Sequence, residues 1–196
     1  INTGTELLLE QQDELSRDKI EYLLLTIQRG GQRLQRLIDD FILVQQIDNG
    51  GAAKLQQRFR NAISVNELVS LALDIYQDFK EEVQIELAFD WASNQAPEVE
   101  VYAMQIADAL FRLIANACKF SPAGSKVVIH GELVGQQILI SVEDQGPGLD
   151  ENVIQQACER FAQIDRDRYE QQGCGLGLPI ANYLTELNGG EMRFEN

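Results

Sequence analysis

The chain of 196 residues is poor in basic side chains and has a single histidine. Its 16 Lys and Arg face 31 Asp and Glu, and the formal charge of -15 argues against a nucleic-acid partner, because duplex binding requires clustered cations. Its three cysteines, Cys118, Cys158 and Cys174, have neither CxxC spacing nor histidine neighbours. This pattern argues against a thiolate metal cluster and indicates reduced thiols.

Long apolar runs are also missing. No run reaches the ~18 residues of a membrane span, and the first thirty or so residues lack the apolar core of a signal peptide. The sequence therefore predicts a cytoplasmic segment without membrane contact. Because the chain begins with Ile1 and ends on a predicted strand, EMRFEN, without a stop signal, we expect a piece of a longer protein, whose own membrane attachment stays open.

The N-terminal part of the sequence predicts a long amphipathic helix. From Ile20 to Val44 apolar residues recur at steps of three and four, which is a heptad pattern. Leu24, Ile38 and Ile42 widen the apolar stripe beyond a two-stranded seam, as in a four-helix bundle. The preceding TELLLEQQ predicts the end of an antiparallel partner helix. Two such hairpins would form a homodimer through residues 5–48.

A second pattern begins after IDNGGAAK, where Asn and Gly favour a helix end, so we place a domain boundary between residues 1–50 and 51–196. Periodicity then predicts helices at 66–80, 104–119 and 178–187 and strands at 83–89, 126–133, 137–143 and in EMRFEN. The predicted fold class is α+β. A helical hairpin is followed by an α/β sandwich, in which helices cover one face of a mixed sheet.

One face of the predicted helix 104–119 carries Asp108, Arg112, Asn116 and Lys119 at helical spacing. A solvated face with an Asp108–Arg112 pair is the plain interpretation. The functional interpretation is that the amide oxygen of Asn116 binds a hard cation while the ammonium of Lys119 binds phosphate. The pattern alone leaves both open.

The stretch VEDQGPGLD, residues 142–150, ends a strand with an acid and two glycines. Asp144 can accept a hydrogen bond from an adenine amine, and Gly146 and Gly148 remove side chains that would keep a flat ring from the backbone. A simple Asp-Gly turn is the alternative.

The second glycine stretch is GCGLGLP, residues 173–179. Gly173, Gly175 and Gly177 lead into a predicted helix whose first N–H groups and dipole favour an anion. The spacing fits neither the dinucleotide fingerprint nor a Walker loop.

In this order the motifs resemble the ATP-binding domain of sensor histidine kinases, within the GHKL ATPase superfamily. LFRLIANACKFSP resembles the N box, VEDQGPGLD the first glycine box, ACERFAQID the phenylalanine box and GCGLGLPIAN the second glycine box. The stretch SRDKIEYLLLTIQRGGQRLQRLIDDFILVQQID resembles the second helix of the dimerisation and histidine phosphotransfer domain.

The resemblance implies a kinase that uses ATP and Mg²⁺, passing the γ-phosphoryl group to a histidine and then to the receiver domain of a response regulator. Asn116 would ligate the metal, and residues 161–172 would form a lid. The implied ATP-binding residues are Asn116, Lys119, Phe120, Asp144, Gly146, Gly148, Phe161, Arg168, Gly173, Gly175, Leu176, Gly177 and Leu178.

The sequence departs from the family in three places. Its one histidine, His130, lies in a predicted strand, so we expect the phosphoacceptor upstream of Ile1 and no autophosphorylation of this chain alone. Arg112 stands where the family usually has Asn and other GHKL ATPases have Glu; as a fixed charge it is a possible catalytic residue. Gln163 stands where many relatives have Arg. A nucleotide-binding pseudokinase scaffold and, less favoured, a hydrolytic ATPase remain as alternatives.

Overall fold

The computed structural model describes residues 16–76, 83–91, 96–148, 152, 154 and 176–195. The chain divides into two compact units, Ile1–Asn49 and Gly50–Asn196, and each is described by itself. Gly50 begins the second unit with a φ of 71°, a left-handed conformation that favours glycine. The predicted partner helix around TELLLEQQ lies outside the described residues.

The described part of the first unit is one long helix, α2 (Arg17–Asp48), as its heptad pattern predicted. Its large apolar side chains are mostly exposed. Those that are at least 44% exposed are Tyr22, Leu24, Leu25, Leu34, Leu37, Ile38, Phe41 and Ile42. We call these eight side chains the α2 stripe.

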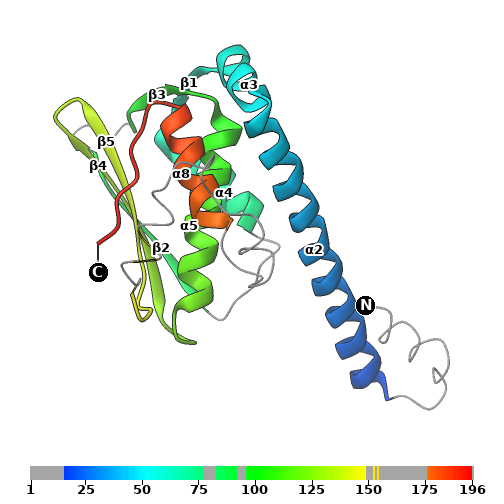
Figure 1. Cartoon of the computed structure of the whole chain (residues 1–196). Helices are drawn as coiled ribbons and strands as arrows, with labels where there is room; N and C mark the ends of the chain where they lie inside the picture. The colour runs from blue at the N-terminus through cyan, green and yellow to red at the C-terminus, as the bar shows by residue number, and fades with distance from the viewer. Residues whose placement is uncertain are drawn as a thin grey trace. The chain divides into compact units, whose positions relative to one another are not determined.

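The second unit contains a three-stranded mixed sheet (Figure 1). Strand β4 (Lys126–Val134) lies in the middle, parallel to β2 (Gln84–Asp90) and antiparallel to β5 (Gln137–Glu143). The β4–β5 hairpin turns at Gly135, whose φ is 65°. A separate antiparallel pair joins β1 (Asn61–Ser64) to β3 (Glu98–Val101).

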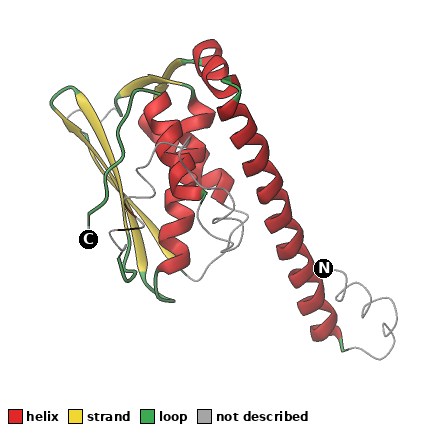
Figure 2. Ribbon diagram, viewed as in Figure 1, coloured by secondary structure: helices red, strands yellow, loops and turns green. Residues whose placement is uncertain are grey.

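Helices α4 (Val65–Tyr76), α5 (Ala103–Phe120) and α8 (Gly177–Leu187) lie on one face of the three-stranded sheet (Figures 1 and 2). Helices α4 and α5 place apolar residues at helical spacing toward this layer, so that Val69 and Ile114 meet Val127 and Ile129 in the core, and α8 buries Ile180 and Leu184. A short helix, α3 (Gly51–Phe59), precedes β1. The predicted α+β class, with helices on one face of a mixed sheet, is confirmed.

Two parts of the prediction differ from the structure. The prediction of a strand in EMRFEN is wrong over residues 191–195. Met192 and Phe194 are half-buried between exposed neighbours, as in a strand, but the segment is not hydrogen-bonded to any of the described strands. Alternating burial without a partner strand does not make a β-strand. Helix α3 and strands β1 and β3 were not predicted, because they are too short to show a period. Among the described residues, no helix is both long enough and apolar enough to cross a membrane.

Candidate functional site

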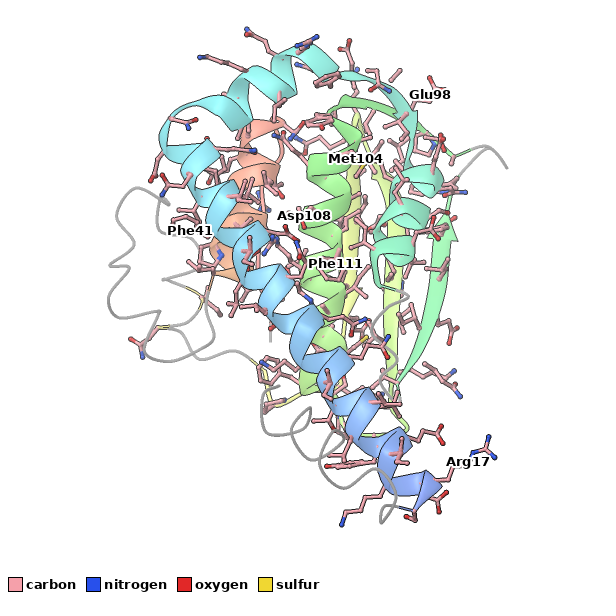
Figure 3. The ribbon with its side chains drawn as sticks, turned by 90° about the vertical axis from the view of Figure 1, so that its right-hand side faces the viewer. Arg17, Phe41, Glu98, Met104, Asp108 and Phe111 are labelled. Carbon is pink, nitrogen blue, oxygen red and sulfur yellow. The ribbon has the colours of Figure 1, made fainter. Side chains whose placement is uncertain are left out.

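The polar face of α5 holds an ion pair. Arg112 Nε donates to Asp108 Oδ2 at 3.1 Å, and the two side chains are 11% and 27% exposed. The pair expected from helical spacing is therefore present, and Asp108 holds the guanidinium along α5 rather than leaving it to solvent; Figure 3 marks Asp108 between Met104 and Phe111 on this helix. Asn116 follows one turn later and is half-buried.

Lys119 lies near the end of α5, where its ammonium is 4.9 Å from the centre of the Phe120 ring. Both side chains are exposed. A cation over an aromatic face is held in place while it keeps access to solvent. The end of α5 therefore presents a positive charge and an open ring side by side.

The loop after β5 is shaped around Asp144. The Gly146 N–H donates to Asp144 Oδ1 at 2.7 Å, so the Asp-Gly turn exists as predicted by the plain interpretation. This bond fixes the direction of the carboxylate. Among the described residues, no partner engages Asp144 Oδ2, which leaves an exposed acceptor at the end of the strand.

The position of Gly146 leaves no room for a side chain, and this lack of room, rather than a special backbone angle, favours glycine there. A Cβ there would stand 2.7 Å from Asp144 Oδ1 and 3.2 Å from the Phe120 carbonyl oxygen. The loop therefore lies directly against the end of α5, and Ser121 Oγ accepts from Gln145 N at 3.4 Å across the same junction. Sequence reasoning missed Ser121; its position just before Pro122, after a helix, was the available signal. Gly148 has a φ of 77°, which favours glycine.

Helix α8 begins at Gly177, with its first backbone bond running from Ile180 N to Leu176 O at 3.0 Å. The N–H groups of Gly177 and Leu178 lie ahead of the helical ladder, and Pro179 has none to give. Two donors at the positive end of a helix dipole are compatible with the anion site predicted from the second glycine stretch, which stays a prediction.

Helices α5 and α8 pack antiparallel, with Asn188 at the end of α8 bonded to Tyr102 at the start of α5 (Figure 1). The end of α5 and the start of α8 therefore lie at the same end of the pair. The loop at Asp144 contacts Phe120 at the end of α5. The end of α5, this loop and the start of α8 carry parts of three of the four predicted motifs, and we call them together the α5–α8 site. Phe161, Arg168, Gly173 and Gly175 lie outside the described residues.

The described residues hold no cluster of three or more His, Cys, Asp or Glu suited to a metal. A metal at the α5–α8 site would therefore depend on the Asn116 amide oxygen and on oxygens of a bound ligand. His130 lies on β4, where its Nε2 is 3.2 Å from Glu143 Oε2 on β5. Cys118 is a reduced cysteine, outside any disulfide of the described residues, and is buried in the core.

Comparison with known proteins identifies the fold that carries this site. Residues 101–196, which include all of α5, the Asp144 loop and α8, match the family "Histidine kinase-, DNA gyrase B-, and HSP90-like ATPase". The sensor histidine kinase RppB of Synechocystis is 31% identical over 189 residues, which cover 94% of this chain and 40% of RppB. The chain belongs to the sensor histidine kinases.

Two further similarities agree with membership of the sensor histidine kinases. The circadian input-output histidine kinase CikA of Synechococcus elongatus is 30% identical over 93% of this chain and 24% of its own length. The histidine kinase AdeS of Acinetobacter baumannii shares the fold, with a TM-score of 0.60 over 100% of this chain and 86% of AdeS, at 19% identity. The histidine kinase chain described here thus spans less than half the length of RppB and CikA.

Proposed function

We propose that residues 51–196 bind Mg-ATP at the α5–α8 site and transfer its γ-phosphoryl group to a histidine, for relay to the receiver domain of a response regulator. The observation that supports this proposal is the contact between the loop of Asp144, whose carboxylate the Gly146 N–H holds, and the end of α5, the helix that carries Asn116. The N–H groups of Gly177 and Leu178, which lie before the first backbone bond of α8, are directed toward the same end of the α5–α8 pair. Catalysis in such a site consists of positioning and electrostatics. Because the reaction consumes ATP, we place it in the cytoplasm.

Adenine fits the loop after β5. Asp144 Oδ2 accepts from the exocyclic amine, while the Gly146 N–H holds the other oxygen of the same carboxylate at 2.7 Å. A Cβ at Gly146 would stand 2.7 Å from the Asp144 Oδ1 atom and 3.2 Å from the Phe120 carbonyl oxygen, so a larger residue would displace the carboxylate proposed to hold the base. Asp144 therefore sets both the position and the hydrogen-bond pattern of the base.

The phosphates and the metal fit the other two elements. Mg²⁺ supplies charge neutralisation to the phosphates when it is bound, and the Asn116 oxygen is the protein ligand offered by α5. Lys119 adds a flexible positive charge, and the N–H groups of Gly177 and Leu178 donate to a phosphate oxygen. Phe161, Arg168, Gly173, Gly175 and a lid at 161–172 complete this proposal.

Residues 1–50 are proposed to form part of a dimerisation and phosphotransfer bundle. The α2 stripe supports this, because eight large apolar side chains on one helix are stable in water only when another helix covers them. A second copy of the chain is the proposed partner through residues 5–48.

The phosphoacceptor is proposed to be a histidine other than His130. That imidazole is paired with Glu143 on the β4–β5 hairpin of the second unit, whereas the bundle is proposed on α2 of the first unit. We therefore expect no autophosphorylation of the 196-residue chain, and labelling of a longer chain that carries an acceptor histidine on its bundle.

A pseudokinase that binds ATP without transferring phosphate is the second candidate, and the Asp108–Arg112 pair favours it. The pair occupies the turn before Asn116 with an arginine that its partner already neutralises, so this position offers neither an amide ligand nor a general base.

Calorimetry with Mg-ATP tests the nucleotide site. Asp144→Asn, Asn116→Ala and Gly146→Ala should each weaken binding about tenfold or more, since each removes or displaces one proposed contact. Glu143→Gln, the neighbouring exposed carboxylate, is the matched control and should bind like the parent. Equal affinity in all four variants would refute the site.

Incubation of the longer chain with γ-labelled ATP separates the two candidates. An acid-labile, base-stable label on the bundle histidine supports the kinase. Binding of ATP without any label supports the pseudokinase, and a label on His130 of the short chain contradicts the assignment of the acceptor.

A further inference from the structure

A chain of buried amide groups joins α8 to α5 and α3, at the opposite end of these helices from the α5–α8 site. Asn188 Oδ1 accepts from Tyr102 N at 2.8 Å, and Asn188 Nδ2 donates to Gln105 Oε1 at 3.0 Å and to Leu184 O at 2.9 Å. Gln105 Nε2 in turn donates to Ala52 O at 2.9 Å. Asn188 and Gln105 are only 8% and 7% exposed.

The direction of every bond in this chain is determined by its two ends. Tyr102 N can only donate, so the oxygen of the Asn188 amide must face it and the NH₂ must face Gln105. Ala52 O can only accept, so Gln105 must turn its own NH₂ toward α3 and its oxygen toward Asn188. No flipped arrangement satisfies both backbone groups. The two side chains therefore act as one clamp with a single geometry.

The clamp determines how α8 lies along α5. Asn188 is the C-cap of α8 and Tyr102 is the N-cap of α5, and the helices run antiparallel from this point (Figure 1). The 11 residues of α8 span about 16 Å, and the same length along α5 reaches about Leu113, roughly one turn before Asn116. Because the other ends are joined, the start of α8 lies roughly one turn before Asn116 along α5, and α5 continues past it to Phe120.

Small shifts along this pair matter. Sliding α8 by a single residue moves Gly177 by about 1.5 Å relative to Asn116, whereas a hydrogen bond tolerates only about half an ångström. Both helices also bury apolar side chains, among them Ile114 on α5 and Ile180 and Leu184 on α8, and apolar packing is non-directional. The bonds of the clamp are directional, so they help to fix the register between the proposed phosphate-binding and metal-binding elements.

We propose that Asn188 and Gln105 are positioning residues for nucleotide binding: their amide clamp holds the start of α8 at the distance from Asn116 that a metal-bound triphosphate requires. The inference rests on the proposed function. It has a specific corollary, because the adenine acceptor Asp144 follows β5 and is not held by α8. Loss of the clamp should weaken binding of the metal-bound phosphates and leave binding of the base unchanged.

Calorimetry with two ligands, adenosine and Mg-ATP, tests the clamp on the whole chain. Asn188→Ala should weaken Mg-ATP binding about tenfold, through loss of buried hydrogen bonds, while adenosine affinity stays within about twofold. Asn182→Ala is the matched control: it is another buried asparagine of α8, 6% exposed, and it donates to Glu186 Oε1 within the same helix. It should leave both affinities unchanged.

A second variant guards against loss of folding. Gln105→Met keeps the side-chain volume and removes only the amide, so it should reproduce the selective loss of Mg-ATP affinity. Combined with Asn188→Ala it should add little, because both changes break one chain of bonds. If circular dichroism shows that Asn188→Ala does not fold, the test of the clamp rests on the Mg-ATP and adenosine affinities of Gln105→Met alone.

The outcomes separate this inference from the proposed function. Equal weakening of adenosine and Mg-ATP in the folded clamp variants, or no change in either ligand, overturns the clamp while the ATP site stands. A parent chain that binds no ATP, or binds it independently of Asp144, overturns the proposed function and the clamp with it.

Discussion

Trp91 lies over Gly131, so that a Cβ at Gly131 would stand 2.7 Å from the indole Cη2. The indole also stacks on Phe89, with ring centres 5.6 Å apart, and donates from Nε1 to Asn66 Oδ1 at 3.1 Å. The position of this ring is therefore fixed from β2, β4 and α4 together.

Gly131→Ala should destabilise the second unit by about 2 kcal/mol, because the indole and Phe89 must both move to admit one methyl group. Trp91 is the single tryptophan, so its fluorescence in urea reports this unit directly. Gly31→Ala should have the opposite effect and stabilise α2 by about 1 kcal/mol, because no atom lies within 4 Å of its Cβ position. An unchanged urea midpoint in Gly131→Ala would show that the ring is not held in place.

Because Asp108 and Arg112 form an ion pair, substituting either one should change the Mg²⁺ dependence of ATP binding, and the two changes should be opposite in direction. Arg112→Asn leaves the Asp108 carboxylate unbalanced one turn before Asn116, so metal-free ATP should bind about fivefold more weakly and the gain on adding Mg²⁺ should grow. Asp108→Asn instead leaves the Arg112 guanidinium unbalanced there. We expect metal-free ATP to bind about fivefold more tightly and the gain on adding Mg²⁺ to shrink.

Titration of both variants with ATP, in EDTA and then in Mg²⁺, measures this difference. If Asp108→Asn and Arg112→Asn shift metal-free binding in the same direction, the charge argument is wrong, and Arg112 takes part in binding in some other way.

The α2 stripe predicts a dimer that a single charge disrupts. Leu37→Glu, on a side chain that is 56% exposed, should raise the dimer dissociation constant at least about tenfold, because the charge must be desolvated in the bundle. Leu139→Glu, at 50% exposure on β5, is the control and should leave association unchanged. Analytical ultracentrifugation gives both values. A parent chain that stays monomeric at high concentration would count against the bundle.

Alkaline pH should weaken the fold through Tyr183. Burial raises the pKa of its phenol above the ordinary value of 10.0, so the folded chain holds this proton more tightly than the unfolded chain does. Stability from Tyr183 is therefore complete below about pH 10 and is lost as the pH rises through the folded pKa. Tyr183→Phe should lose less stability between pH 9 and pH 11 than the parent in urea unfolding. Tyr22→Phe, 67% exposed on α2, should follow the parent.

Long periodic elements were predictable from sequence, and pairings between distant residues were not. Helices α2 and α5 show their apolar faces over several turns, and the β4–β5 hairpin shows alternation around Gly135. Helix α3 has nine residues and β1 four, which is too few to establish a period. The alternation of apolar and polar residues in EMRFEN led to a wrong strand prediction, because a strand requires a hydrogen-bonded partner as well as a pattern.

The residues of the candidate site divide in the same way, into those with local sequence signals and those brought together only by the tertiary structure. The Asp108–Arg112 pair was predictable because it spans one turn, and the structure confirms it. Asp144 and Asn116 were proposed as site residues from local motifs, and their roles stay predictions. The bond between Asn188 and Gln105 joins residues 83 positions apart, and two amides in helical segments give no sign in sequence that they will meet. Ser121 contacts the Asp144 loop through a 3.4 Å bond that depends equally on tertiary structure.

The parallel pairing of β2 with β4 affects the order in which the chain can fold. Gln84 and Lys126 are aligned although they are about forty positions apart, and the connection between them must carry β3 and α5 back along the sheet. Helix α2 requires only neighbours three or four residues away and can form within microseconds. During synthesis α2 therefore leaves the ribosome and folds first, with its apolar stripe open to other chains before the nucleotide-binding unit has closed its sheet.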